Sequence, residues 1–173
     1  LVRLSALAEA DCRQVLSHIL DGEPEPRLEI LARLGEGAPG RAAGLAASGS
    51  DDMYRALCLL IAETRPDETA LAELCDKWGR GGAAGQAGRE GALWLVGRLF
   101  RLAAKHAVSP ADTNACEFEV AAIDRLTSTR SAPELATAHT DFLTAAERMG
   151  SLYMDFGLFL NRELSGLFRK TLP

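Results

Sequence analysis

The sequence lacks both a long apolar run and a phosphate-binding loop. Its longest unbroken apolar run is the seven residues 56–62, whereas a membrane-spanning helix needs about 20. No stretch matches the G-x-x-x-x-G-K-[ST] loop that cradles nucleotide phosphates. These absences predict a chain without a membrane span and without a nucleotide site of the phosphate-loop kind.

Cysteines are few and widely spaced. Cys12, Cys58, Cys75 and Cys116 form no C-x-x-C pair, and none lies at metal-ligand spacing from a histidine. Each falls within a helical apolar pattern, which is typical of reduced, buried cysteine. This usage predicts a cytoplasmic protein that holds no metal and no other cofactor.

Basic residues do not dominate the charge. The 173 residues include 19 Lys and Arg against 24 Asp and Glu, a net charge of −5, which argues against DNA binding through overall charge. Locally, Arg98, Arg101 and Lys105 recur at helical spacing and form a candidate basic face. A solvated helix face is the favoured interpretation, with contact to a phosphate backbone or an acidic partner as the alternative.

Candidate catalytic groups do not cluster in the sequence. Glu117 and Glu119 are two residues apart and so do not share a helix face. Residues 79–84 match G-x-G-x-x-A, but a dinucleotide site needs this run after a strand, and here a helix precedes it. The three histidines, His18, His106 and His139, are isolated from one another, and the sequence does not suggest a nucleophile pair for any of them. We expect no catalysis by this chain, with a small enzyme using a spatial His–carboxylate site as a minor alternative.

The hydrophobic spacing is helical almost throughout, so the predicted fold class is all-α. It indicates three small helices in residues 1–48 and about six in residues 49–173. Residues 48–50 are predicted to be a flexible connection between the two sets of helices, with Ser50 as the cap of the next helix. Residues 1–4 are the only candidate strand. The glycines of residues 79–91 predict a loop over at least the first half of that range, and residues 127–132 are predicted to be a turn.

Apolar side chains are dense in the last two predicted helices, over 135–153 and 156–170. They form either internal core or, in part, a subunit interface that uses both sides of a helix. The candidate interface anchors are Tyr153, Phe156, Phe159 and Phe168.

Two stretches of the sequence are similar to motifs of a known protein family. Residues 1–11 are similar to the L-x-L-x-P-L-s-x-x-D passage that follows the sensor-1 strand of clamp-loader AAA+ modules, with Ala6 in place of proline. Residues 31–42 are similar to the lid signature L-A-x-L-s-x-G-S-P-G-R-A, with Ala38 in place of serine. Read together, these stretches resemble the delta prime family of bacterial DNA polymerase III clamp-loader subunits. Residues 51–61 and 152–156 are also similar to segments of this family. The gamma/tau lid usually reads Gly-Ser-x-Arg-Asp-Ala, so delta prime is the better match.

The resemblance implies a three-helix AAA+ lid in residues 1–48 and a helical collar domain in residues 49–173. The lid motif is Pro39, Gly40, Arg41 and Ala42. It further implies a longer protein, whose upstream nucleotide-fold domain carries a zinc module and a Ser-Arg-Cys arginine finger.

The same resemblance implies a non-catalytic assembly element. The expected partners are the gamma/tau and delta subunits, in a five-membered ring that loads the sliding clamp on primed DNA during replication. The resemblance implies that the chain contacts DNA only indirectly, through that ring, and it implies no small-molecule substrate. Arg41 is expected to make a salt bridge or an interface contact rather than bind phosphate. A stand-alone helical adaptor or regulatory bundle is the alternative.

Overall fold

The computed structural model describes residues 5–65, 67–80, 83–151 and 155–169. Within these ranges the chain forms nine α-helices, one short 3-10 helix and no strand, which confirms the all-α prediction. The predicted strand at 1–4 lies outside the described residues. None of the described helices is both long and apolar enough to cross a membrane. The helices are α1 (Glu9–Ile19), α2 (Glu25–Gly35), α3 (Pro39–Ala47), α4 (Ser50–Ala62), α5 (Glu68–Gly79), α6 (Ala83–His106), α7 (Glu117–Thr129), α8 (Ala132–Ser151) and α9 (Phe156–Arg169).

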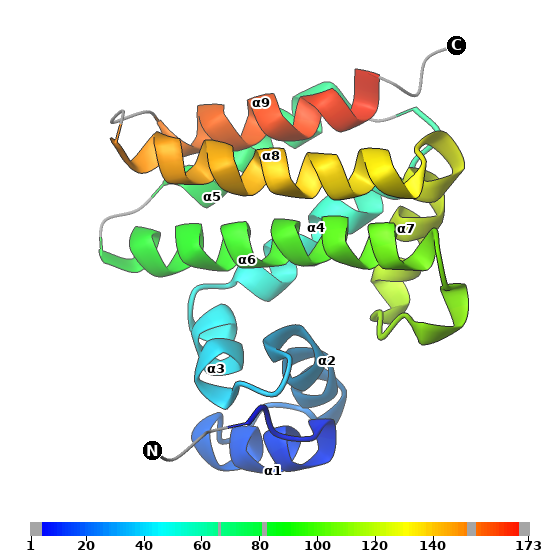
Figure 1. Cartoon of the computed structure of the whole chain (residues 1–173). Helices are drawn as coiled ribbons and strands as arrows, with labels where there is room; N and C mark the ends of the chain where they lie inside the picture. The colour runs from blue at the N-terminus through cyan, green and yellow to red at the C-terminus, as the bar shows by residue number, and fades with distance from the viewer. Residues whose placement is uncertain (1–4, 66, 81–82, 152–154, 170–173) are drawn as a thin grey trace.

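Helices α1, α2 and α3 form a small unit below the rest of the chain in Figure 1, each packed on the other two. Their apolar stripes meet in a core that includes Leu16, Leu31 and Leu34, all fully buried. Helix α3 begins at Pro39, whose missing N–H costs nothing in the first turn. Its N-cap, Ala38, offers no side-chain acceptor, as expected where alanine replaces serine.

Helices α4 to α9 form a bundle in which α6 packs on α8, α5 on α9 and α4 on α7 (Figure 1). The prediction of a loop over at least the first half of residues 79–91 is wrong from Ala83 onward, because α6 begins there. Gly91 lies inside that helix for a packing reason. A Cβ at this position would lie 2.5 Å from the Ser50 Oγ, so any side chain would push α6 away from the start of α4.

Side-chain caps fix the start of several bundle helices. The Asp67 carboxylate accepts from the backbone N–H groups of Thr69 and Ala70 at the start of α5. At the start of α7, Glu119 accepts from the backbone N–H of Cys116 at 2.6 Å. Helix α7 then runs to Thr129 and α8 begins at Ala132, so most of the predicted turn at 127–132 is helical.

Candidate functional site

The two helical units meet at a set of polar contacts, which we call the joint. Its covalent part is the turn of residues 48–50, where Gly49 adopts a left-handed conformation with φ of +65°. Ser50 is not the predicted N-cap, because it is the first residue of α4 and Gly49 occupies the cap position. The Ser50 hydroxyl is fully buried, lies 2.8 Å from the Ser48 hydroxyl and accepts from the Trp78 indole at 3.4 Å. Hydrogen bonds of Ser48 and Ser50 thus hold this turn in place.

Arg98 lies at the centre of the joint. Its guanidinium donates to Glu119 through Nε at 2.9 Å and Nη2 at 3.1 Å, and Nη2 also donates to the Asn114 carbonyl at 2.8 Å. Its side chain is 1% exposed and that of Glu119 is 0% exposed. The prediction of a solvated basic face is therefore wrong at Arg98, although Arg101 and Lys105 are exposed.

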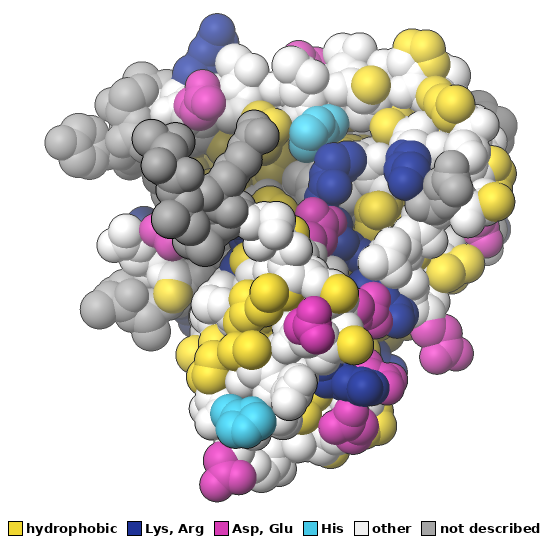
Figure 2. Space-filling model, turned by 60° about the horizontal axis from the view of Figure 1, so that its bottom comes forward, with side chains coloured by type: hydrophobic (Ala, Val, Ile, Leu, Met, Phe, Trp, Pro, Cys, Tyr) yellow, Lys and Arg dark blue, Asp and Glu magenta, His cyan; other side chains and the backbone are white. Residues whose placement is uncertain are grey.

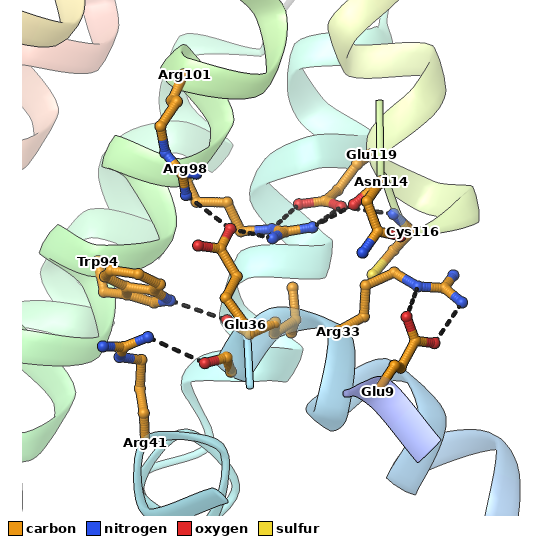
Figure 3. A network of polar contacts seen from close by, with 12 residues as sticks. Glu9, Arg33, Glu36, Arg41, Trp94, Arg98, Arg101, Asn114, Cys116 and Glu119 are labelled. Atoms are coloured by element: carbon orange, nitrogen blue, oxygen red, sulfur yellow. Dashed lines mark hydrogen bonds and ion pairs between the residues drawn. The ribbon is translucent and has the colours of Figure 1, made fainter. Parts of the chain in front are cut away.

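Glu36 carries the network across to the three-helix unit. Its Oε1 accepts from Arg98 Nη1 at 2.5 Å and from Arg101 Nη2 at 2.6 Å (Figure 3). Glu36 follows the end of α2 and has φ of +48°, the only positive φ of a non-glycine residue in the described chain. A left-handed backbone is costly for a residue with a Cβ, and the two ion pairs stabilise it here.

Trp94 makes a second connection between the two units. From α6, its indole N–H donates to the Leu34 carbonyl at the end of α2, at 2.9 Å. The Arg41 guanidinium lies over the Trp94 ring, 3.6 Å from the ring centroid, and donates to the Gly35 carbonyl at 3.0 Å (Figure 3). Arg41, for which a salt bridge or an interface contact was expected, thus makes a cation–π contact and a carbonyl hydrogen bond.

Further ion pairs support this arrangement. Arg27 of α2 pairs with Asp51 of α4 at 3.1 Å and with Glu23 at 2.8 Å. Asp51 is almost fully buried, so this contact also closes the joint. Within the three-helix unit, Arg33 holds Glu9 at 2.8 Å. The two units are therefore fixed to each other through three separate contacts, at Arg27, Trp94 and Glu36.

Protonation follows from burial and pairing. Burial acts to raise the pKa of Glu119, but hydrogen bonds and charge from Arg98, with hydrogen bonds from the Cys116 amide and the Tyr54 hydroxyl, bring that pKa below its ordinary value. Burial acts to lower the pKa of Arg98, and Glu119 outweighs it, so that pKa is raised. Tyr54 donates to Glu119 at 2.7 Å, and burial holds its pKa well above the usual range. The cluster is a charged pair that holds structure rather than a proton donor near neutral pH.

A pocket of about 270 Å³ opens beside this network. Figure 2 shows acidic and basic side chains next to one another where the three-helix unit meets the bundle. The charged residues that line the pocket are Glu9, Arg33, Glu36, Arg98, Arg101 and Lys105.

Two of the four predicted aromatic anchors lie in the core. Phe156 and Phe159 are each 1% exposed, and the Phe159 ring stacks on Phe142 at 6.0 Å between centroids. The prediction that these two anchor a subunit interface is therefore wrong for the folded chain. Tyr153 and the side chain of Phe168 lie outside what the structure describes. Among the large apolar side chains of α8 and α9 that the structure describes, the exposed ones are Leu143 and Leu158, at 42% and 71% exposure.

The cysteines are all free and buried, as predicted. Burial raises the pKa of Cys75 and of Cys116 to about 12, so neither is a reactive thiolate at neutral pH. Within the described ranges, no group of three His, Cys, Asp or Glu side chains is placed to hold a metal ion.

Two residues of the joint, Glu36 and Trp94, were not singled out by the sequence pattern, and Glu119 was considered only beside Glu117. One signal was present for Arg98, the partner of Glu36 and Glu119. Arg98 lies three residues after Leu95 and four before Leu102, which places it on the apolar stripe of its helix. A charge on an apolar stripe predicts a buried partner but does not say which residue supplies it.

Comparison with known proteins finds no match among family models, curated proteins or solved structures.

Proposed function

We propose that this chain is the non-catalytic lid and collar part of a clamp-loader subunit of the delta prime kind. Residues 1–48 are the lid and residues 49–173 the collar, which assembles with the gamma/tau and delta subunits into the ring that loads the sliding clamp in the bacterial cytoplasm. One observation carries the proposal. The lid motif opens α3, and its Arg41 is stacked on Trp94 at the boundary between the two helical units.

The use of Arg41 supports a subunit that does not act on nucleotide. In an AAA+ lid, the arginine at this place can reach a bound phosphate, whereas here its guanidinium contacts Trp94 and the Gly35 carbonyl. Arg98 is likewise committed to Glu119 and Glu36. The chain thus uses its best-placed arginines to fix the lid on the collar, as a structural member of a ring requires.

The partner surface proposed for the collar differs from the one expected from the sequence. Among the described side chains of the last two helices, Leu158 on α9 is the most exposed large apolar one, and Leu143 on α8 is also exposed. Apolar side chains of this size are typical interface anchors when a partner covers them. The net charge of −5 supports contact with DNA only through the assembled ring.

Reading the gene upstream of the codon for Leu1 tests this proposal at once. We expect an in-frame nucleotide-fold domain with a Ser-Arg-Cys arginine finger. An initiator codon directly before Leu1 would contradict the proposal and favour the stand-alone helical adaptor.

Calorimetry with MgATP is a second test, with a gamma/tau subunit as the positive control. The isolated chain should show no saturable binding in the micromolar range, because it carries neither a phosphate loop nor a Mg²⁺-binding acid pair. Micromolar binding would count against a delta prime assignment.

A further inference from the structure

A groove runs between α8 and α9, the last two helices of the bundle. The two helices are antiparallel neighbours in Figure 1, but α8 packs mainly on α6 and α9 mainly on α5, so their contact with each other is slight. Two cavities of about 460 and 510 Å³ follow one another along the seam that this arrangement leaves. Both cavities have walls from α8 and α9, and two residues line both, so together they form one continuous groove.

The groove has an apolar floor and two hollows. Phe142 lies at the floor of the first cavity and Phe159 at the floor of the second, and their rings stack at 6.0 Å between centroids. The wall of α8 is small at Ala138 in the first cavity and at Ala145 in the second. These alanines are seven residues apart, which is about 10.5 Å along a helix axis. The groove therefore offers two apolar hollows that are separated by two helical turns.

Two carboxylates mark the place where the cavities join. Asp141 on α8 and Glu163 on α9 line both cavities, from opposite walls of the groove. Glu163 is held by Arg162 at 2.6 Å. Asp141 is exposed and makes no ion pair or side-chain hydrogen bond within the described ranges. The arginines of the groove have partners of their own, since Arg130 donates to carbonyl groups of α9 and Arg148 is also engaged. A negative charge without a counter-ion thus lies between the two hollows.

An amphipathic helix with a basic residue at its centre matches this pattern. Apolar side chains at positions i and i+7 of a helix lie on one face, two turns apart, as the two hollows do. A Lys or Arg at position i+4 lies on the same face between them, where Asp141 can accept from it. A second copy of this chain does not supply such a helix, because no two of the exposed large apolar side chains among the described residues stand seven apart.

We propose that the groove between α8 and α9 docks an amphipathic helix of another protein, with apolar residues at i and i+7 and a basic residue at i+4. The apolar side chains fill the hollows at Ala138 and Ala145, and the basic side chain pairs with Asp141. Neither Leu143 nor Leu158 lines the groove. This surface is therefore separate from the one proposed for the clamp-loader partners, and it does not depend on that proposal.

Fluorescence anisotropy with a labelled peptide tests the groove. The probe is an alanine-based peptide of about 18 residues, long enough to be helical by itself, with leucine at i and i+7 and arginine at i+4. We expect saturable binding of this arginine peptide to the wild-type chain. A glutamate peptide, which differs only in having glutamate in place of the arginine, should bind about tenfold more weakly, because it places a like charge beside Asp141.

Reversal of the charge in the groove should reverse this preference. Asp141→Lys should bind the glutamate peptide more tightly than the arginine peptide, and it should stay folded because Asp141 is exposed. Glu147→Lys is the matched control, since Glu147 is exposed on the same helix and lines neither cavity. If circular dichroism shows Asp141→Lys to be unfolded, Asp141→Asn replaces it and should bind the two peptides equally.

The proposal is overturned if the wild-type chain binds neither peptide or does not distinguish them, or if Glu147→Lys changes the preference as much as Asp141→Lys does. A variant of the arginine peptide with proline at its centre cannot form a continuous helix. Equal binding of that variant would indicate an extended segment as the occupant and would also overturn the proposal. So would a dimer of the chain that Asp141→Lys dissociates in analytical ultracentrifugation, because a second copy would then fill the groove.

Discussion

Arg98 and Glu119 stand 21 residues apart in the sequence and form a two-point salt bridge in which both side chains are shielded from solvent. Burial of a charge is costly unless the charge is paired and hydrogen-bonded. Here both conditions are met, since Glu119 also accepts from the Tyr54 hydroxyl and the Cys116 amide. The pair joins α6 to the first turn of α7, and through Glu36 it reaches the three-helix unit.

Arg98→Met should be severely destabilising. The substitution leaves Glu119 buried without its counter-charge, a loss that typically costs about 3–5 kcal/mol. Urea denaturation measures the free energy of unfolding. Arg162→Met, at an exposed arginine of α9, is the control and should change that free energy by less than about 0.5 kcal/mol. Equal effects of the two substitutions would show that the buried pair contributes no more to the free energy of unfolding than an exposed arginine does.

Acid should weaken the fold through Glu119. Its folded-state pKa is below the ordinary value, so the unfolded state binds more protons in the interval between the two values and stability rises with pH there. The contribution of Glu119 is fully present above the unfolded value of about 4.3 and is lost as pH falls through the lower, folded value.

Denaturation midpoints measured from pH 6 down to pH 2 check this dependence. Glu119→Gln should make the acid limb shallower, while Glu117→Gln, two residues away and exposed, should leave it unchanged. An acid limb as steep in Glu119→Gln as in the wild type would assign the pH dependence to other carboxylates.

The contact between Arg41 and Trp94 should be worth a small, measurable amount. With the guanidinium 3.6 Å from the ring centroid, Arg41→Gln should reduce the free energy of unfolding by about 0.5–1 kcal/mol. Arg55→Gln is the matched control, because Arg55 is exposed and lies 6.0 Å from the Phe118 ring. If the two variants are equally stable, the lid-motif arginine has no structural role at the joint.

The helices were predictable because their apolar spacing is local information. The helix that begins at Ala83, where a loop was predicted, has a physical reason. Glycine disfavours a helix by only about 1 kcal/mol per residue, and tertiary packing of α6 outweighs it, as at Gly91 beside Ser50.

The joint was much less predictable. Glu36 and Arg98 are 62 residues apart, and Leu34 and Trp94 are 60 apart, so no local pattern pairs them. The burial of Phe156 and Phe159 has the same origin. An aromatic stripe has the same sequence pattern whether it faces the chain's own core or a partner. Only the position of Phe142 across the core distinguishes the two cases.

The partner surface proposed for the last two helices can be tested with a matched pair of substitutions on adjacent residues of α9. Leu158→Asp should leave the chain folded, because Leu158 is 71% exposed, and it should weaken assembly about thirtyfold, as loss of a 2 kcal/mol anchor would. Phe159→Asp should unfold the bundle, because it places a charge in the core. Circular dichroism and a binding titration against gamma/tau separate these outcomes. Full affinity in Leu158→Asp would move the interface elsewhere.

Assembly itself is the most direct test of the central claim. The chain is mixed with the gamma/tau and delta subunits of the same organism, and the mass of the product is measured by native mass spectrometry. We predict a complex of five subunits that contains one copy of this chain. A chain that remains alone, while gamma/tau and delta associate without it, would contradict the clamp-loader role that we propose for it.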